Sequence, residues 1–205
     1  HASRLCGWNV EKQWRSCPST PIRVTICHRP ANAPPMQAPP SPALRGLAPL
    51  VSSDTRVLIL GSFPGKRSLE LQQYYAHPQN QFWKLLQAIW PSSPLEMSPN
   101  SYENRSSWLL QRGLGLWDVY ASCEREGSLD SAIRNAVPND IAALHLPHLQ
   151  AIAHNGGESF KHARHTRTLG VPTYPLPSTS PANASWSFER KLQAWREVMH
   201  LHGLV

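Results

Sequence analysis

The stretch Arg56-Val-Leu-Ile-Leu-Gly-Ser-Phe-Pro-Gly-Lys66 decides which fold the rest of the chain can adopt. Its apolar run from Val57 to Leu60 is short and uninterrupted, as expected for a strand that is covered on both faces. The Gly-Ser-Phe-Pro-Gly segment that follows cannot continue as a strand. In an open α/β sheet, the ligand crevice lies beyond the carboxyl ends of the parallel strands. We therefore expect Gly61 to Gly65 to form the floor of a binding site.

The segments after this stretch alternate between strand and helix patterns. Further strands are expected at 114–120, 149–155 and 173–176, and helices at 68–73, 82–90, 101–113 and 158–166. Ser101 is the expected N-cap of the third of these helices, and Asn139 that of a segment at 141–146. Strands that alternate with helices imply an α/β fold, in which helices cover both faces of a parallel sheet.

The last helix has the clearest pattern. Phe188, Leu192, Trp195 and Met199 recur at i, i+4, i+7 and i+11, so they share one face of a helix that Ser185 is expected to open. This face should pack on the sheet.

Length and charge restrict the function classes. A chain of 205 residues can hold one domain of ordinary size and an appendage. A net charge of +7 favours a polyanionic partner, with nucleic acid ahead of a membrane surface. The sequence has no apolar stretch of the ~20 residues that a transmembrane helix needs and begins without the apolar region of a signal peptide. We expect an intracellular protein.

The first part of the chain has a different composition. Residues 1–46 show no sustained helix or strand period, and 30–42 is rich in proline. Such a segment buries too little apolar surface to offset its ordering entropy. We expect residues 1–46 to be a poorly ordered extension and 47–205 to be the functional domain.

The four cysteines, Cys6, Cys17, Cys27 and Cys123, contain no C-x-x-C pair. Their spacing argues against a zinc or iron–sulfur site and favours free thiols. No metal and no cofactor are expected.

Three loops should meet at the carboxyl edge of the sheet. They are Gly61 to Gly65, the strand end at Trp117-Asp118, and the segment Pro177-Ser-Thr-Ser-Pro-Ala-Asn-Ala184. The third loop offers hydroxyls and backbone N–H groups of the kind that grip a phosphate. It can also be read as an ordinary connection between a strand and a capped helix.

The order of these motifs resembles the uracil-DNA glycosylase superfamily. The motifs are Gly61-Ser-Phe-Pro-Gly65, Tyr75-Ala-His-Pro-Gln-Asn-Gln-Phe-Trp83 and Leu176-Pro-Ser-Thr-Ser-Pro-Ala-Asn183. They are most similar to the branch that acts on hypoxanthine (deoxyinosine) in DNA, and the resemblance covers about Leu47 to Leu201. It implies a three-layer α/β/α sandwich around a mainly parallel sheet of about four strands. The implied partner is DNA and the implied state a monomer. The implied activity is base flipping and cleavage of the N-glycosidic bond in base excision repair, without a metal.

The resemblance also implies roles for residues of the first two motifs. Phe63 stands where mismatch-uracil relatives carry the Asn that orients the attacking water, so Asn80 is the implied water-positioning group. Tyr75 matches the aromatic residue on which the flipped base stacks, and Asp118 lies where a side chain meets the base edge. The backbone N–H groups of 63–65 are expected to stabilise charge on the base. The remaining residues expected to bind the base are Gly61, Ser62, Pro64 and Gly65.

The third motif implies contacts to the DNA backbone. Ser178, counted with the catalytic group, and its neighbours match a motif whose hydroxyls hold phosphates. The residue that wedges into the vacated base stack corresponds to Ala182, whose methyl group makes a poor wedge. The expected DNA-binding residues are Ser68, Thr179, Ser180, Pro181, Ala182 and Asn183.

Several alternatives stay open. Asn80 can be a structural cap, Tyr75 a core aromatic and Asp118 a partner for a nearby arginine. A Walker A loop does not fit, because it needs four residues between its glycines and Ser or Thr directly after Lys. A uracil-specific enzyme and a catalytically silent DNA-binding relative remain possible, since Phe63 and Ala182 depart from the superfamily pattern.

Overall fold

The computed structural model of the protein describes residues 43–205, which belong to a compact unit that spans Pro40–Val205. Most of the expected extension therefore lies outside the described residues. Leu44–Arg45, which the sequence analysis assigned to the extension, instead forms β1 and pairs antiparallel with β4 (Tyr120–Glu124). The folded part thus begins before residue 47.

A four-stranded parallel sheet forms the centre of this unit, in the order β3-β2-β6-β7. The strands are β2 (Val57–Gly61), β3 (Leu114–Asp118), β6 (Ala151–Asn155) and β7 (Thr173–Leu176). Every residue of β2 is buried, because the strand is paired on both edges and covered on both faces. The expectation of a mainly parallel sheet of about four strands is confirmed.

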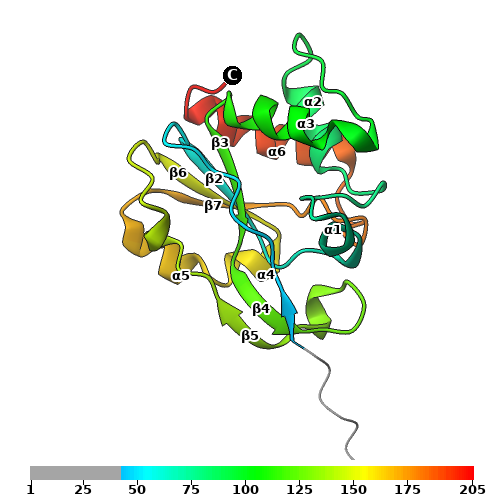
Figure 1. The fold of residues 1–205 in the computed structure, drawn as a ribbon. Coiled ribbons are helices and arrows are strands. Elements are labelled where there is room, and N and C mark those ends of the chain that lie inside the picture. Colours follow the sequence, from blue (N-terminus) through cyan, green and yellow to red (C-terminus); the bar gives the residue numbers. More distant parts are fainter. Residues whose placement is uncertain (1–42) are drawn as a thin grey trace, which may run out of the picture. The chain divides into compact units, whose positions relative to one another are not determined.

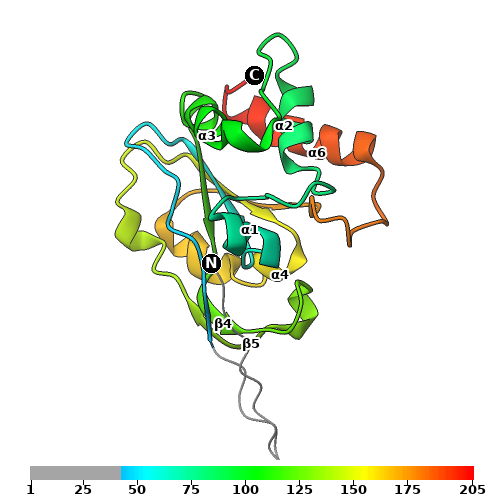
Figure 2. The same ribbon diagram turned by 45° about the vertical axis from the view of Figure 1, so that its right-hand side comes forward.

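Helices cover the sheet on both faces and make it the middle of three layers (Figures 1 and 2). One face carries α2 (Phe82–Ile89), α3 (Tyr102–Leu110) and α6 (Phe188–Leu201). The other carries α4 (Gly157–Phe160) and α5 (Ala163–Thr166), two short helices in place of the single one expected at 158–166. The remaining helical segments are α1 (Lys66–Leu71) and the 3₁₀ turns η1 (Pro99–Ser101), η2 (Asp130–Ala132), η3 (Ala142–Leu144) and η4 (Arg167–Leu169).

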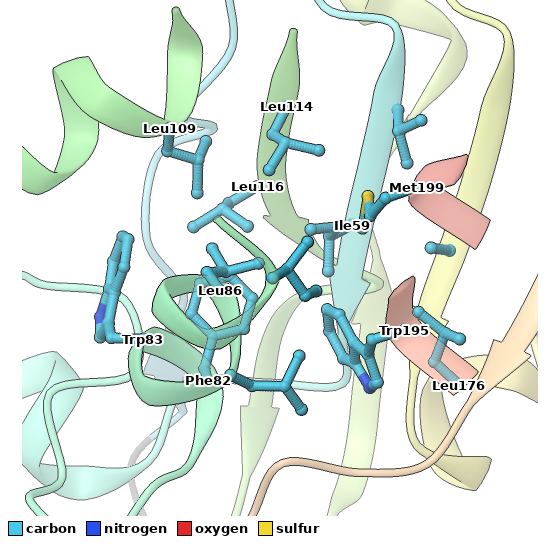
Figure 3. Close-up of a cluster of buried hydrophobic side chains, with 14 of the residues drawn as sticks. Ile59, Phe82, Trp83, Leu86, Leu109, Leu114, Leu116, Leu176, Trp195 and Met199 are labelled. Atoms are coloured by element: carbon cyan, nitrogen blue, oxygen red, sulfur yellow. The ribbon is translucent and has the colours of Figure 1, made fainter. Parts of the chain in front are cut away.

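The larger core lies between the sheet and α2, α3 and α6. Figure 3 shows Phe82 and Trp195 pointing toward Ile59 of the central strand. The two rings meet edge to face, with centroids 5.8 Å apart. Trp195 and Met199 of the last helix are buried, and Phe188 and Leu192 pack against the same cluster, so the expected apolar face is confirmed.

A second, antiparallel sheet was not expected. It has the order β1-β4-β5, with β5 at Arg134–Pro138. The expected strand 114–120 ends at Asp118, since Val119 makes one last bond from its N–H to the carbonyl of Gly61 and Tyr120 already belongs to β4 of the other sheet. This sheet carries the segment 125–133 toward the ends of the parallel strands.

The expected N-cap Ser101 does not cap α3. Its hydroxyl donates to the carbonyl oxygens of Glu96 and Ser98, both at 2.7 Å. The physical reason is the 3₁₀ turn η1, which ends at Ser101 and leads directly into the helix.

Two other expected caps are also wrong. The Asn139 amide donates to the carbonyl of Asp118 at 2.9 Å, so this side chain ties a loop to the end of β3. The last helix is capped by Ser187, whose extended backbone lets its hydroxyl accept the N–H of Arg190, and Ser185 lies before it.

Candidate active site

A cavity of about 520 Å³ lies at the carboxyl ends of the parallel strands. Every residue that the sequence analysis proposed for the site lines this cavity. The structure therefore brings together segments that are far apart in the chain. It also adds lining residues that the sequence analysis missed, namely Lys66, Arg67, Tyr74, His77, Ser128, Leu129, Asp130 and Asn155.

Asn155 is the most connected of the residues that were missed. Its amide nitrogen donates to the Tyr75 hydroxyl at 3.0 Å and to the Thr179 hydroxyl at 2.9 Å, and its Oδ1 accepts the Thr179 N–H at 2.9 Å. One side chain at the end of β6 thus holds two walls of the cavity. Its position as the last residue of a buried strand was the signal that could have found it.

Tyr75 serves both as a cavity wall and as a core contact. Its ring stacks on Phe82 at a centroid distance of 4.0 Å and an interplanar angle of 23°. Its backbone has a φ of 53°, in the left-handed region that residues other than glycine rarely adopt. Burial raises the pKa of its hydroxyl, which keeps the group neutral. The ring is held in a fixed orientation.

Asn80 is fixed at the start of α2. Its Oδ1 accepts the N–H of Phe82 at 2.9 Å, and its own N–H bonds to the carbonyl of His77. The next residue, Gln81, donates its N–H to the carbonyl of Thr179. Asn80 therefore has the contact of a structural cap and also lines the cavity.

The Phe63 side chain is buried on the other side of the floor loop. It belongs to the smaller core, which packs beneath β2, and the guanidinium carbon of Arg125 lies 5.1 Å from its ring centroid. Arg125 also donates to the carbonyl oxygen of Pro64. Phe63 thus packs in the smaller core and also lines the cavity.

Asp118 is a buried carboxyl group at the end of β3, only 4% exposed. Its Oδ2 has no hydrogen-bond partner within residues 43–205, and no arginine forms an ion pair with it there, as the alternative reading of Asp118 would need. Burial raises the pKa of Asp118 to about 7; the charge of Asp130 adds to this shift and that of Arg125 opposes it. A Cβ at Gly61 would collide with Asp118 Oδ1, so a larger residue there would displace this carboxyl.

Two residues that were expected to contact DNA are buried beneath the loops. The Ser68 hydroxyl accepts the N–H of Ala76, and the side chain of Thr179 is bonded to Asn155. Their burial leaves no surface for a phosphate, so they shape the cavity from below. Ser180, Pro181, Ala182 and Asn183 remain at its partly or fully exposed rim.

Comparison with known proteins decides the family. A protein-family model described as "Uracil DNA glycosylase superfamily" matches residues 48–199 of the sequence. The chain belongs to the uracil DNA glycosylase superfamily. It is 35% identical over 156 residues to a protein of Methanosarcina barkeri named "Hypoxanthine DNA glycosylase", a match that covers 75% of this chain and 96% of the relative. A protein of the same name from Methanosarcina acetivorans is 36% identical over 156 residues, and this match also covers 75% of this chain and 96% of the relative.

A solved structure of the superfamily confirms the fold. The solution structure of a Methanosarcina acetivorans protein, described as a uracil DNA glycosylase, has a TM-score of 0.68 and 34% identity to this chain. The match covers 78% of this chain and 98% of the other.

The superfamily's third motif is held by a buried lysine. Lys191 on α6 donates to the Gln81 side chain at 2.8 Å and to the carbonyl of Asn183 at 3.0 Å. Gly156, with a φ of 102°, lets Ser178 approach, because a Cβ there would lie 3.0 Å from that of Ser178. These contacts fix the loop 178–183 against the sheet.

Residues 43–205 show no sign of a metal site. They contain no group of three or more His, Cys, Asp and Glu side chains placed to hold a metal ion. Cys123 is a buried free thiol, whereas Cys6, Cys17 and Cys27 lie outside the described residues. No helix in this part of the chain is long and apolar enough to cross a membrane.

The raised pKa of Asp118 predicts a pH-dependent stability. The folded protein keeps this proton up to a pH of about 7, whereas the unfolded chain loses it near 3.8, so the folded state binds more protons in between. The contribution of Asp118 to the free energy of unfolding should therefore fall as pH rises through this window, by up to ~1.4 kcal/mol per pH unit. Asp118→Asn cannot titrate, and its stability relative to the wild type should rise from pH 5 to pH 7.

Urea unfolding at pH 5, 6, 7 and 8 measures this difference. Asp54→Asn, which removes a carboxyl group at an exposed position, is the matched control. A difference between Asp118→Asn and the wild type that is constant with pH would contradict the assignment of a raised pKa to Asp118.

Proposed function

We propose that the protein is a monofunctional DNA glycosylase that flips a deaminated base, hypoxanthine first, out of DNA and hydrolyses its N-glycosidic bond. One observation carries the proposal: an aromatic wall, a fixed amide and a buried carboxyl line one cavity, in a chain whose relatives are named hypoxanthine DNA glycosylases. The volume of about 520 Å³ lies within the range of small-molecule sites.

The base enters between the Tyr75 ring and the floor loop. Stacking on a ring that Phe82 and Asn155 already hold costs little ordering entropy. In its ionised form Asp118 accepts the ring N–H that hypoxanthine and uracil carry and adenine lacks. Its unpartnered, buried Oδ2 supports this role, because a bound base can supply the missing contact.

Departure of the base leaves an oxocarbenium-like sugar and places negative charge on the base. Pro64 has no N–H, so the backbone N–H groups of Phe63 and Gly65 stabilise that charge. Asn80 orients the water that attacks C1′. An amide cannot take the proton of this water at neutral pH. The proposal therefore requires a dissociative step, in which the N-glycosidic bond breaks first and the water then adds to C1′. The proton of the water passes to the departed anionic base or to solvent, so little help from a general base is needed.

The DNA backbone is held at the rim of the cavity. Lys66 and Arg67 are exposed there, and Ser180 and Asn183 lie on the facing motif. The net charge of +7 supports a polyanionic substrate. The cavity is built by one chain, which fits an enzyme that works as a monomer.

A single-turnover assay on synthetic duplexes tests this function. Duplexes with one inosine, one uracil or no lesion are incubated with excess protein, and abasic sites are revealed by alkaline cleavage. We expect cleavage of the inosine strand, slower cleavage of the uracil strand and none of the undamaged strand. Faster cleavage at uracil would favour the uracil-specific alternative, and specific binding without cleavage would favour a silent DNA-binding relative.

A further inference from the structure

The position that supplies the wedge in the superfamily is occupied here by Ala182. This residue is exposed at the rim of the cavity, and its N–H bonds to the Ser180 hydroxyl at 3.2 Å. A methyl group is too small to fill the space that a flipped nucleotide leaves. If the protein flips bases out of duplex DNA, as proposed above, another side chain has to fill that space.

Leu129 is suited to fill it. It is 58% exposed although it is a large apolar residue, and it lines the same cavity as Ala182. The other exposed large apolar side chains of residues 43–205 do not line this cavity; they are Leu71, Met97, Val137, Trp186, Leu201 and Val205. The exposed apolar surface of Leu129 thus coincides with the place where DNA must bind.

The backbone around Leu129 is pinned on both sides. The hydroxyl of Ser128 accepts the N–H of Lys66 at 3.1 Å, and the carboxylate of Asp130 accepts the Ser62 hydroxyl at 2.6 Å. Ser62 belongs to the floor loop, and Lys66 is the first residue of α1. These bonds hold Leu129 at a fixed place relative to the floor of the cavity, as a wedge requires.

The surroundings of Leu129 suit a DNA backbone. Lys66 and Arg67 are exposed and line the same cavity, whereas the Asp130 carboxylate is turned toward Ser62. In Figures 1 and 2 the loop that carries η2 and the segment after β7 lie on the same side of the molecule as α1. A duplex bound over the cavity would meet both loops at once.

We propose that Leu129, from the segment between β4 and β5, is the side chain that enters the base stack when the nucleotide is flipped. Apolar side chains such as leucine are used as wedges between base steps by proteins that distort DNA. The wedge has thus moved from the third motif, where Ala182 stands, to a different loop of the same cavity. This inference rests on the proposed function.

Leu129→Ala tests the proposal, with Leu201→Ala as the matched control, because Leu201 is 61% exposed and lies away from the cavity. Single-turnover excision is measured for inosine opposite cytosine, inosine opposite thymine and inosine in a single strand. Unstacking costs a few kcal/mol and least in single strands. Leu129→Ala should lose about tenfold or more opposite cytosine, less opposite thymine and nothing in the single strand. Leu129→Met should retain the wild-type rates.

A second readout does not depend on excision. A 2-aminopurine placed next to the inosine reports unstacking through its fluorescence when protein binds. The wild type and Leu201→Ala should raise this fluorescence, and Leu129→Ala should not.

Each outcome decides a different question. An equal loss on all three substrates would make Leu129 a wall of the base site, and unchanged duplex rates would remove it from flipping; either result overturns the proposal. If the wild type excises nothing, the proposed function fails, and the fluorescence difference between the Leu129→Ala and Leu201→Ala variants still tests the wedge.

Discussion

Asn80→Ala should lower the single-turnover rate of base excision by ~10²-fold or more, while the affinity for inosine-containing duplex changes little. Asn80 is a fixed amide in the cavity wall, and in the proposed mechanism it orients the water and does not bind the base. Fluorescence anisotropy measures affinity, and rapid quench followed by alkaline cleavage measures the rate.

The cap contact of Asn80 requires a control for stability. Loss of the bond to the Phe82 N–H should cost ~1 kcal/mol of folding free energy, so the melting temperature of each variant has to be measured. Asn104→Ala removes an exposed asparagine from α3 and should change neither rate nor affinity. Near-normal turnover in folded Asn80→Ala protein would leave this residue as a structural cap alone.

Tyr75→Ala should weaken capture of the flipped base by ~1–3 kcal/mol, which is about 5-fold to 150-fold in the affinity for inosine DNA. The ring is one wall of the cavity, and its other contact is the stacked ring of Phe82. Tyr75→Phe is the matched control, because it keeps the ring and removes only the bond with Asn155. It should retain most of the affinity.

The two aromatic variants also separate stacking from packing. A Tyr75→Ala protein that keeps its affinity and its rate but loses thermal stability would show that Tyr75 serves the core only. A loss of affinity shared equally by Tyr75→Phe would assign the effect to the hydroxyl instead of the ring.

The parallel sheet and the place of the site could be predicted from the sequence. The run from Val57 to Leu60 is apolar because both faces of β2 are buried, and Gly61, the residue after it, leaves room for the Asp118 carboxyl. These are local patterns with a direct physical cause. From these patterns the candidate site residues could be predicted, and the structure shows all of them lining one cavity.

The second sheet could not be predicted in the same way. The residues of β5 are mostly exposed and show no alternation of apolar and polar side chains. The strand exists because it pairs with β4, and this pairing depends on where β3 ends. The segment with Leu129 and Asp130 reaches the cavity only because that sheet forms. Its own sequence therefore gave no indication that it lines the cavity.

Side-chain contacts across loops were also beyond the sequence. Asn155 could be placed at a strand end, but its bonds to Tyr75 and Thr179 depend on the tertiary approach of two distant segments. The choice between Ser185 and Ser187 as a helix cap depends on one extended backbone conformation. Both serines have the same propensity to cap.

The release of free base tests the central claim most directly. A duplex with one inosine is incubated with excess protein, and the products are separated and weighed by liquid chromatography and mass spectrometry. The account predicts free hypoxanthine and an unbroken strand with one abasic site, in equal amounts, and none of either with Asn80→Ala on the same time scale. Intact inosine after complete binding, or a cut strand that still carries its inosine, would contradict it.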